Sequence, residues 1–343
     1  LTTLCGMGVM IFAQHPALHS IASLSVIGIL SILFISFTIQ PVIFEALIVG
    51  RSKKGLAPYT LRSSIATLVA YLYFISGCLV LSLVTLLLTI SPFRKNSKKY
   101  LLHRLIYRMS KSLIYLMFNV KKNYPNKAQL QLNKPAVIIA NHQSFLDIMM
   151  ILMLHPKIVI MTNSWVWNSP IFGRFIRFAD FIPADAGAES SAKKLESLIH
   201  QGYSVMIFPE GTRSKNGKIA RFKKGAFYLA EKFNLDILPI IFHGTGDCIR
   251  KNDFMVHSTT VQMKALPRIS PKDLQWGQRY SERSKSIGRY FKSEYKKVHQ
   301  EANTAASVKN KLIHNYIYKG PVLEWYTRIK IQLEDLYRTF DRI

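Results

Sequence analysis

Charged side chains are nearly absent from the first 90 residues and crowd the remainder of the chain. Nearly all of the formal net charge of +27 falls from Arg94 onward, over a total length of 343 residues. Long uncharged segments need a bilayer or a large core to bury them. The pattern therefore predicts a membrane portion first and a basic domain second, and the length suffices for one catalytic domain beside the membrane portion.

The first long apolar run predicts a membrane span. Ile21 to Ile39 carries no charge, the run continues to Ile48 with Glu45 near its end, and basic residues from Arg51 to Lys54 close it. About 20 apolar residues cross a bilayer core, and a basic end favours the cytoplasmic side. Leu1 to Ala13 is too short to cross and lacks the basic start and cleavage site of a signal peptide. We interpret it as the remnant of a longer helix, and the chain as a fragment.

The second apolar run, Ser63 to Ile90, is uncharged over 28 residues. A straight helix of that length measures about 42 Å, which exceeds the bilayer core of roughly 30 Å. A full crossing would also carry Arg94 and Lys95 to the side opposite the first basic cluster, against the positive-inside tendency. We therefore expect a re-entrant hairpin that bends at Ser76-Gly77, with a full span as the alternative.

A basic amphipathic helix is predicted from Lys98 to Phe118. Its apolar residues recur at helical spacing, opposite Arg104, Arg108 and Lys111. Such a helix can lie in the headgroup plane of an anionic leaflet or pack on a domain with its basic face in solvent. The residues leave both interpretations open.

The basic character admits several partners. Zinc-finger spacing and RNP-like aromatic runs are missing from the sequence, and the basic residues lie beside apolar spans, so a membrane surface is favoured over nucleic acid. Cys5, Cys78 and Cys248 are too few and too far apart for a disulfide framework or a cysteine metal site. His243 and His257 are isolated, and no metal site is expected.

After Tyr124-Pro125 short β-branched runs alternate with helical stretches. The predicted strands are Ala136 to Ala140, Lys157 to Met161, Ser204 to Phe208, Ile237 to Phe242 and Thr260 to Ala265. The predicted helices are Ser144 to Leu154, Glu189 to His200, Arg221 to Phe233 and, further on, Asn315 to Ile343. Such alternation predicts an α/β fold with a sheet that is at least partly parallel.

The first candidate for chemistry follows the strand at 136–140. His142 and Asp147 lie five residues apart, so on a regular helix they would point about 140° apart. A strand-to-helix turn between them would let Asp147 hold one imidazole nitrogen and leave the other as a base. The structural alternative is that Ser144 caps the helix and Asp147 is an acidic first-turn residue.

The second candidate is Phe208-Pro209-Glu210-Gly211-Thr212-Arg213-Ser214, between a predicted strand and a basic helix that begins near Lys223. An arginine in a glycine-containing turn with free backbone donors can clamp a phosphate. The alternative is a surface turn with a solvated arginine.

Together the two blocks resemble those of the glycerolipid acyltransferase family, the PlsC-like 1-acylglycerol-3-phosphate acyltransferases. His142 and Asp147 match an N-H-x4-D block, and Phe208 to Ser214 match an F-P-E-G-T-R-S block, in the right order. Pro170 with Phe172-Gly173 and Leu238 to Ile240 fit neighbouring positions. The resemblance covers about Lys134 to Arg268 and implies a mixed sheet flanked by helices.

The resemblance implies direct acyl transfer from acyl-CoA or acyl carrier protein to a lysophospholipid, without a further cofactor. In it His142 would be the general base, Asp147 would orient it, and Glu210, Gly211, Thr212 and Arg213 would bind the acceptor. Ser144 as a nucleophile is disfavoured. The chain departs from the family at Phe181 to Asp185, where a basic residue that contacts the acceptor phosphate is usual. Either Arg174 or Arg177 replaces that contact, or the acceptor is a phosphate-free lyso-lipid or another unusual acceptor.

The segment before Leu47, with Gly6, Phe12-Ala13, Pro16 to Leu18, Gly28 and Gln40-Pro41, resembles the last two helices of MMPL/RND-type lipid exporters. An unrelated hydrophobic anchor is the alternative. The expected division is exporter-like helices at 1–49, a membrane hairpin or span at 50–92, the interfacial helix at 93–124, the acyltransferase domain at 125–305, and a helical linker or further domain at 306–343. The expected place is the inner membrane, multi-pass, with the catalytic domain in the cytoplasm. A role in transport, with the acyltransferase part as a docking module, is the rival function.

Overall fold

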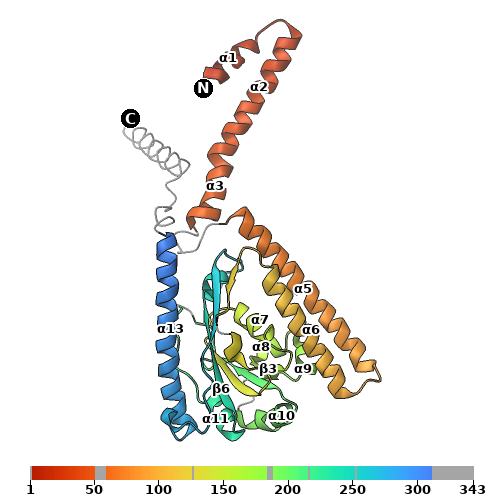
Figure 1. The fold of residues 1–343 in the computed structure, drawn as a ribbon. Helices are drawn as coiled ribbons and strands as arrows, with labels where there is room; N and C mark the ends of the chain where they lie inside the picture. Colours follow the sequence, from red (N-terminus) through yellow and green to blue (C-terminus); the bar gives the residue numbers. More distant parts are fainter. Residues whose placement is uncertain are drawn as a thin grey trace.

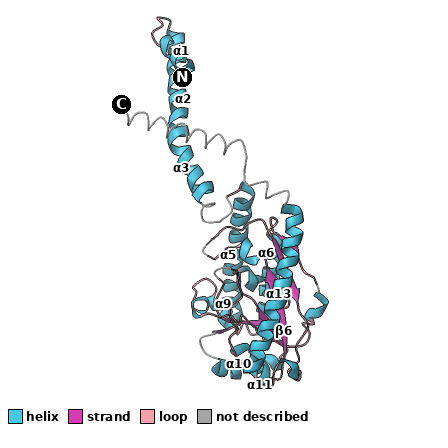
Figure 2. Cartoon of the chain, turned by 90° about the vertical axis from the view of Figure 1, so that its left-hand side faces the viewer, coloured by secondary structure: helices cyan, strands magenta, loops and turns pink. Residues whose placement is uncertain are grey.

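A layered α/β body carries the strands, and a long apolar helix protrudes from it (Figure 1). The computed structural model describes residues 2–50, 59–125, 127–183, 188–214, 217–251 and 253–310. The helix predicted at Asn315 to Ile343 lies outside the described residues. Helices α5 and α6 lie on one side of the sheet and α13 lies on the other (Figures 1 and 2).

The sheet has seven strands in the order β1-β7-β6-β2-β5-β3-β4. Their bounds are β1 Lys121–Asn123, β2 Ala136–Ala140, β3 Ile158–Thr162, β4 Ile182–Pro183, β5 Ser204–Ile207, β6 Asp236–His243 and β7 Thr260–Ala265. Neighbouring strands are parallel except for β6 and β7, which are antiparallel. The predicted α/β fold with a partly parallel sheet is confirmed, and so are the five predicted strands.

Strand β2 is central because its sequence is apolar on both faces. Ala136, Ile138 and Ala140 face one core, which also contains α6 and α7, and Val137 and Ile139 face a second core under α11 and α13. All five residues are buried, as expected for an interior strand of a parallel sheet. The chain turn that follows β2 is consequently held from both sides.

The helices that cover the sheet come from several parts of the chain. Their bounds are α7 Leu146–Leu152, α8 Ser164–Trp167, α9 Gly173–Phe178, α10 Ala188–His200, α11 Gly225–Lys232, α12 Thr245–Cys248 and α13 Tyr280–Asn310. The helices predicted near α7, α10 and α11 are confirmed. Helix α13 buries Ile287, Phe291 and Val298 in the second core.

Helix α5, Leu61–Ile90, is continuous, so the bend expected at Ser76-Gly77 is wrong. The chain turns back through α6, Lys95–Leu116, which packs against α5 along its length (Figure 1). At Gly77 a Cβ atom would lie only 2.6 Å from Sδ of Met109 in α6. The glycine therefore serves a close helix contact, and the helix remains straight because its backbone hydrogen bonds are intact.

The apolar face of α6 is part of the domain core. Leu102, Ile106, Leu113 and Ile114 are buried, while Arg104, Arg108 and Lys111 are exposed. Contacts with α5 and α7 account for this burial. Helix α6 thus packs on the domain with its basic face exposed, and a contact of that face with an anionic leaflet stays a prediction.

The N-terminal helices are apolar and largely uncovered. Helix α1 is Thr2–Met10, and α2, Pro16–Phe34, continues through η1 Ile35–Ile39, α3 Gln40–Phe44 and η2 Glu45–Val49. Pro16–Leu47 and Leu61–Ile90 are long and apolar enough to cross a membrane, and the apolar windows are 6% and 22% buried in the structure. Because so little of this surface is covered by protein, the two helices indicate membrane association.

Candidate active site

The candidate site begins at the carboxyl end of β2, where the chain turns into α7. Nδ1 of His142 lies 3.0 Å from Oδ2 of Asp147, so the contact predicted from their spacing is confirmed. The same carboxylate oxygen accepts the backbone N–H groups of Gln143 at 2.7 Å and Ser144 at 2.8 Å. Asp147 is fully buried, so its carboxylate fixes both the turn and the imidazole. A carboxylate acceptor at Nδ1 selects the tautomer with its lone pair on Nε2.

Two polar neighbours hold the turn in place. Asn141 exchanges two hydrogen bonds of 2.8 Å with the backbone of Phe242 in β6. The hydroxyl of Ser144 donates to the carbonyl of Ile249 at 2.9 Å and accepts the N–H of Leu146 at 3.3 Å. The role of Asn141 was not predicted beyond its place in the block. Helix α7 begins at Leu146 with Phe145 at its N-cap and has no side-chain cap hydrogen bond, so the expectation that Ser144 caps this helix is wrong.

The second block meets His142 because β2 and β5 are adjacent and parallel, so their carboxyl ends share one edge of the sheet. The His142 ring stacks on Phe208, with centroids 4.0 Å apart and planes 17° apart. Ser214 donates its N–H to the carbonyl of His142 at 2.8 Å. The block therefore packs against both the ring and the backbone of the histidine.

Glu210 is a buried brace. Its Oε1 accepts the N–H of His142 at 2.9 Å, and its Oε2 accepts the N–H of Ala220 at 2.8 Å. Burial raises the pKa of this carboxyl, and the two backbone hydrogen bonds oppose that rise. Sequence reasoning placed Glu210 against the acceptor, whereas the structure directs both of its oxygens at the main chain.

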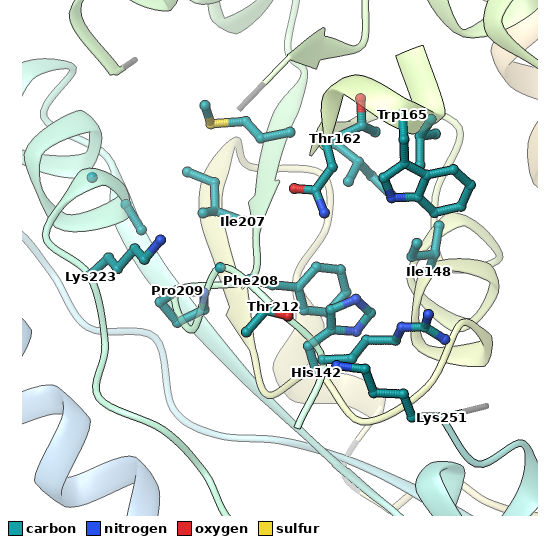
Figure 3. A pocket seen from close by; sticks show the side chains of 18 residues that line it. His142, Ile148, Thr162, Trp165, Ile207, Phe208, Pro209, Thr212, Lys223 and Lys251 are labelled. Carbon is teal, nitrogen blue, oxygen red and sulfur yellow. The ribbon is translucent and has the colours of Figure 1, made fainter. Parts of the chain in front are cut away.

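His142, the less buried member of the His142–Asp147 dyad, lines a cavity of about 410 Å³ that is called here the dyad cavity (Figure 3). His142, Thr212 and Arg213 line it together with Lys223 and Lys251. Gly211 also lines it with a φ of +75°, and a Cβ there would lie 2.6 Å from Nζ of Lys223. A glycine is thus needed both for the backbone conformation and for the approach of the lysine.

Known acyltransferases are similar to this chain in sequence and in fold. Residues 121–243 match the family model described as Acyltransferase. The matched segment contains both His142 and Phe208 to Ser214. The crystal structure of the 1-acyl-sn-glycerophosphate acyltransferase PlsC from Thermotoga maritima is similar in fold, with a TM-score of 0.60 at 21% identity over 70% of this chain and 97% of that one.

Curated relatives include three 1-acyl-sn-glycerol-3-phosphate acyltransferases. The chloroplastic BAT2 of Brassica napus is 31% identical over 183 residues, which are 50% of this chain and 52% of the relative. That of Cocos nucifera is 34% identical over 148 residues, 41% and 48%. The human beta enzyme is 31% identical over 153 residues, 43% and 55%. The chain spans about half the length of these relatives.

The basic lining of the dyad cavity differs from the expected one. Arg174 and Arg177 are not among its lining residues, and the Arg177 guanidinium donates to the carbonyl of Trp167 at 2.6 Å. They lie on α9, which packs on α5. Ala184 and Asp185, from the departing segment, lie outside the described residues. Lys223 and Lys251 supply positive charge instead. Sequence reasoning placed Lys223 only in a basic helix, and nothing in the sequence pointed to Lys251.

An apolar groove of about 490 Å³ adjoins the dyad cavity. Tyr71 and Phe74 of α5, Leu113 of α6 and Met149 of α7 are among its lining residues, and Arg213 and Trp165 border both spaces. Among the residues that the structure describes, no group of three or more His, Cys, Asp or Glu side chains is placed to hold a metal ion. The site thus offers a base, cationic side chains and an apolar groove.

Proposed function

We propose that this acyltransferase domain moves a fatty acyl group from a thioester of coenzyme A or acyl carrier protein to the hydroxyl of a lysophospholipid such as 1-acylglycerol-3-phosphate. The observation that carries the proposal is the His142–Asp147 pair at the mouth of a cavity with a basic lining on one side and an apolar groove on the other. Curated relatives of the chain have names that describe acyltransferases for 1-acyl-sn-glycerol-3-phosphate, an acceptor of that class.

The geometry supports a direct transfer. Nε2 of His142 takes the proton of the acceptor hydroxyl as the oxygen attacks the thioester carbonyl carbon, while Asp147 stabilises the resulting imidazolium. The tetrahedral intermediate collapses, the carbon–sulfur bond breaks, and the imidazolium returns the proton to the thiolate. General-base assistance of this kind is worth about 10² to 10⁴ in rate. Because the Ser144 hydroxyl is bonded to Ile249, an acyl-serine is not part of the proposal.

The linings divide the acceptor by polarity. Arg213, Lys223 and Lys251 surround the cavity and would hold an acceptor phosphate, Arg213 by paired hydrogen bonds. The apolar groove between α5, α6 and α7 would take an acyl chain. Thr212 and Gly211 complete the proposed acceptor site, and Glu210 supports it through the backbone of His142.

The membrane side of the proposal rests on α2 and α5. Their large apolar side chains are exposed to the surroundings, so we place α2 across the cytoplasmic membrane and α5 against or within it, with the catalytic domain in the cytoplasm. The exporter-like interpretation of residues 1–49, and with it a fusion of transport and acyl transfer, stays a prediction.

An acyl-transfer assay tests the function. The chain in lipid vesicles is supplied with radiolabelled acyl-CoA or acyl carrier protein and a lysophospholipid. His142→Ala should lower transfer by at least about 10²-fold. The matched control is His200→Ala, the same change at an exposed position on α10. Inert wild-type protein with both donors would favour the docking role, and an active His142→Ala variant would refute the base assignment.

A further inference from the structure

A second cavity, of about 800 Å³, lies beside the dyad turn and is called here the basic pocket. Its walls come from Gln143, from Ser214 with Gly217 to Ile219, from residues between His243 and Lys251, and from one side of α13. Four distant parts of the chain thus build one concavity, and of its lining residues only Lys251 has a direct role in the acyl-transfer scheme above.

The basic pocket is strongly cationic. Lys218, Arg250, Lys251, Lys292 and Lys296 line it, and Asp247 is the only carboxylate among the described lining residues. Asp247 lies 3.8 Å from Arg250, and both side chains are largely exposed. The nearby Glu294 is engaged elsewhere, by Lys297 at 2.6 Å and by Lys264. Such a concentration of one sign of charge in a concavity attracts a ligand with several negative charges.

Flat rings lie among these cations. Tyr295 and His299 of α13 stack at 11° with centroids 6.2 Å apart, and His299 is hydrogen-bonded to His243 at 2.9 Å. Gln143 donates to the hydroxyl of Tyr295 at 2.6 Å. Aromatic faces beside lysines suit a phosphorylated nucleoside, whose base stacks on the rings while its phosphates meet the ammonium groups.

The basic pocket lies next to His142. Gln143 directly follows His142, and Lys251 lines both the basic pocket and the dyad cavity. Ser214, another lining residue, donates its N–H to the carbonyl of His142. A ligand held by its anionic end in the basic pocket can therefore extend a flexible arm past Lys251 toward the imidazole.

We propose that the basic pocket binds the phosphorylated adenosine end of a coenzyme A thioester, so that the donor enters from the α13 side while the lipid acceptor enters from the cavity and apolar groove. The inference rests on the proposed function, whose donor it places. A carrier protein fits less well, because it brings a single phosphodiester and no base to a concavity with five cations and stacked rings.

Binding of unacylated coenzyme A and of adenosine 3′,5′-bisphosphate, measured by calorimetry in detergent, tests the pocket without turnover. The test variant is Lys292→Glu with Lys296→Glu. The control is Lys285→Glu with Arg289→Glu, equally exposed and equally spaced on α13 but outside the pocket. The test variant should weaken both ligands by roughly tenfold or more, because each lost charge-assisted contact is worth about that factor. Control and wild type should match.

Kinetic measurements and a second variant test the proposal further. In the transfer assay the test variant should raise KM for acyl-CoA and leave KM for the acceptor unchanged, and adenosine 3′,5′-bisphosphate should compete with acyl-CoA. If the glutamate variant unfolds, Lys292→Gln with Lys296→Gln replaces it. Equal binding of coenzyme A by the test and control variants would overturn the proposal. So would a test variant that transfers acyl groups more slowly from acyl carrier protein but at the wild-type rate from acyl-CoA. Coenzyme A binding that persists in His142→Ala without any transfer by wild type would uphold the pocket and refute the function instead.

Discussion

The side chain of Asp147 makes three contacts that position the catalytic turn. One oxygen of its carboxylate faces the imidazole of His142 and accepts two backbone N–H groups of the same turn. The five-residue spacing predicts the contact because only a strand-to-helix turn satisfies it. The partner of His142 in the second block, Glu210, was predicted to bind the acceptor; its hydrogen bonds to the backbone were not predicted, since a motif gives residue types and no direction for their side chains.

Replacement of Glu210 tests whether this residue supports the backbone of His142 or binds the acceptor. Glu210→Ala removes the acceptor of the part-buried N–H of His142, at a cost of about 1 to 3 kcal/mol. It also removes the acceptor of the N–H of Ala220, an exposed residue whose N–H can bind water instead. We expect kcat to fall by roughly one to two orders of magnitude with little change in KM for the acceptor. Glu210→Gln, which keeps an acceptor oxygen, should retain more activity. A rise in acceptor KM alone would show that Glu210 binds substrate.

At the scale of elements, long and regular segments were predictable and short ones were not. Strands β2 and β7 begin and end where the apolar pattern placed them. Strands β1 and β4 have three and two residues, too few for an alternating pattern to be recognised. The bend predicted in α5 was wrong because Gly77 was interpreted as a helix breaker, whereas its role depends on Met109, which is 32 positions away.

The role of Gly77 gives a stability prediction. Gly77→Leu should force α5 and α6 apart, because Sδ and Cγ of Met109 occupy the space of its side chain. Overpacking of this kind costs about 1 to 3 kcal/mol, and Met109→Ala in the same background should recover part of it. The control is Gly28→Leu in α2, where no atom lies within 4 Å of the added Cβ. Thermal unfolding in detergent measures both, and equal midpoints for the two variants would contradict the packing role.

At the scale of the molecule, the two cores and the shared edge of parallel strands explain why the blocks meet. The sequence predicted the fold class and the dyad, yet it could not predict the basic pocket, whose walls come from four segments. It also missed α13 as a wall of the domain, since Ile287, Phe291 and Val298 recur at wide spacing among charged residues.

Acid stability of the whole domain should depend on His103. This residue is buried between Phe181 and Tyr203, and burial lowers its pKa from 6.5 to about 4. Because the unfolded chain takes up the proton first, the stability associated with neutral His103 is present above about pH 6.5 and is lost as the pH falls toward 4. Between pH 7 and 5 the loss is about 2 kcal/mol, since one pKa unit is worth about 1.4 kcal/mol.

Unfolding midpoints at pH 7 and pH 5 check this dependence. His103→Gln, which does not titrate, should show a smaller drop between the two pH values than the wild type, even if it is less stable at pH 7. The exposed His200→Gln serves as the control and should keep the wild-type drop. Identical drops in all three proteins would rule out His103 as the source.

The strand order has a consequence for biosynthesis. Both neighbours of β2, namely β5 and β6, are translated after it. Strand β1 can pair only after β7, its neighbour in the sheet, has been translated as far as Ala265. At about 5 to 20 residues per second, many seconds separate the emergence of α2 and α5 from the ribosome and the completion of the sheet. On the proposed placement of α2 and α5 in the membrane, both helices meet the bilayer while the sheet is still incomplete, so the domain would complete its folding beside the membrane.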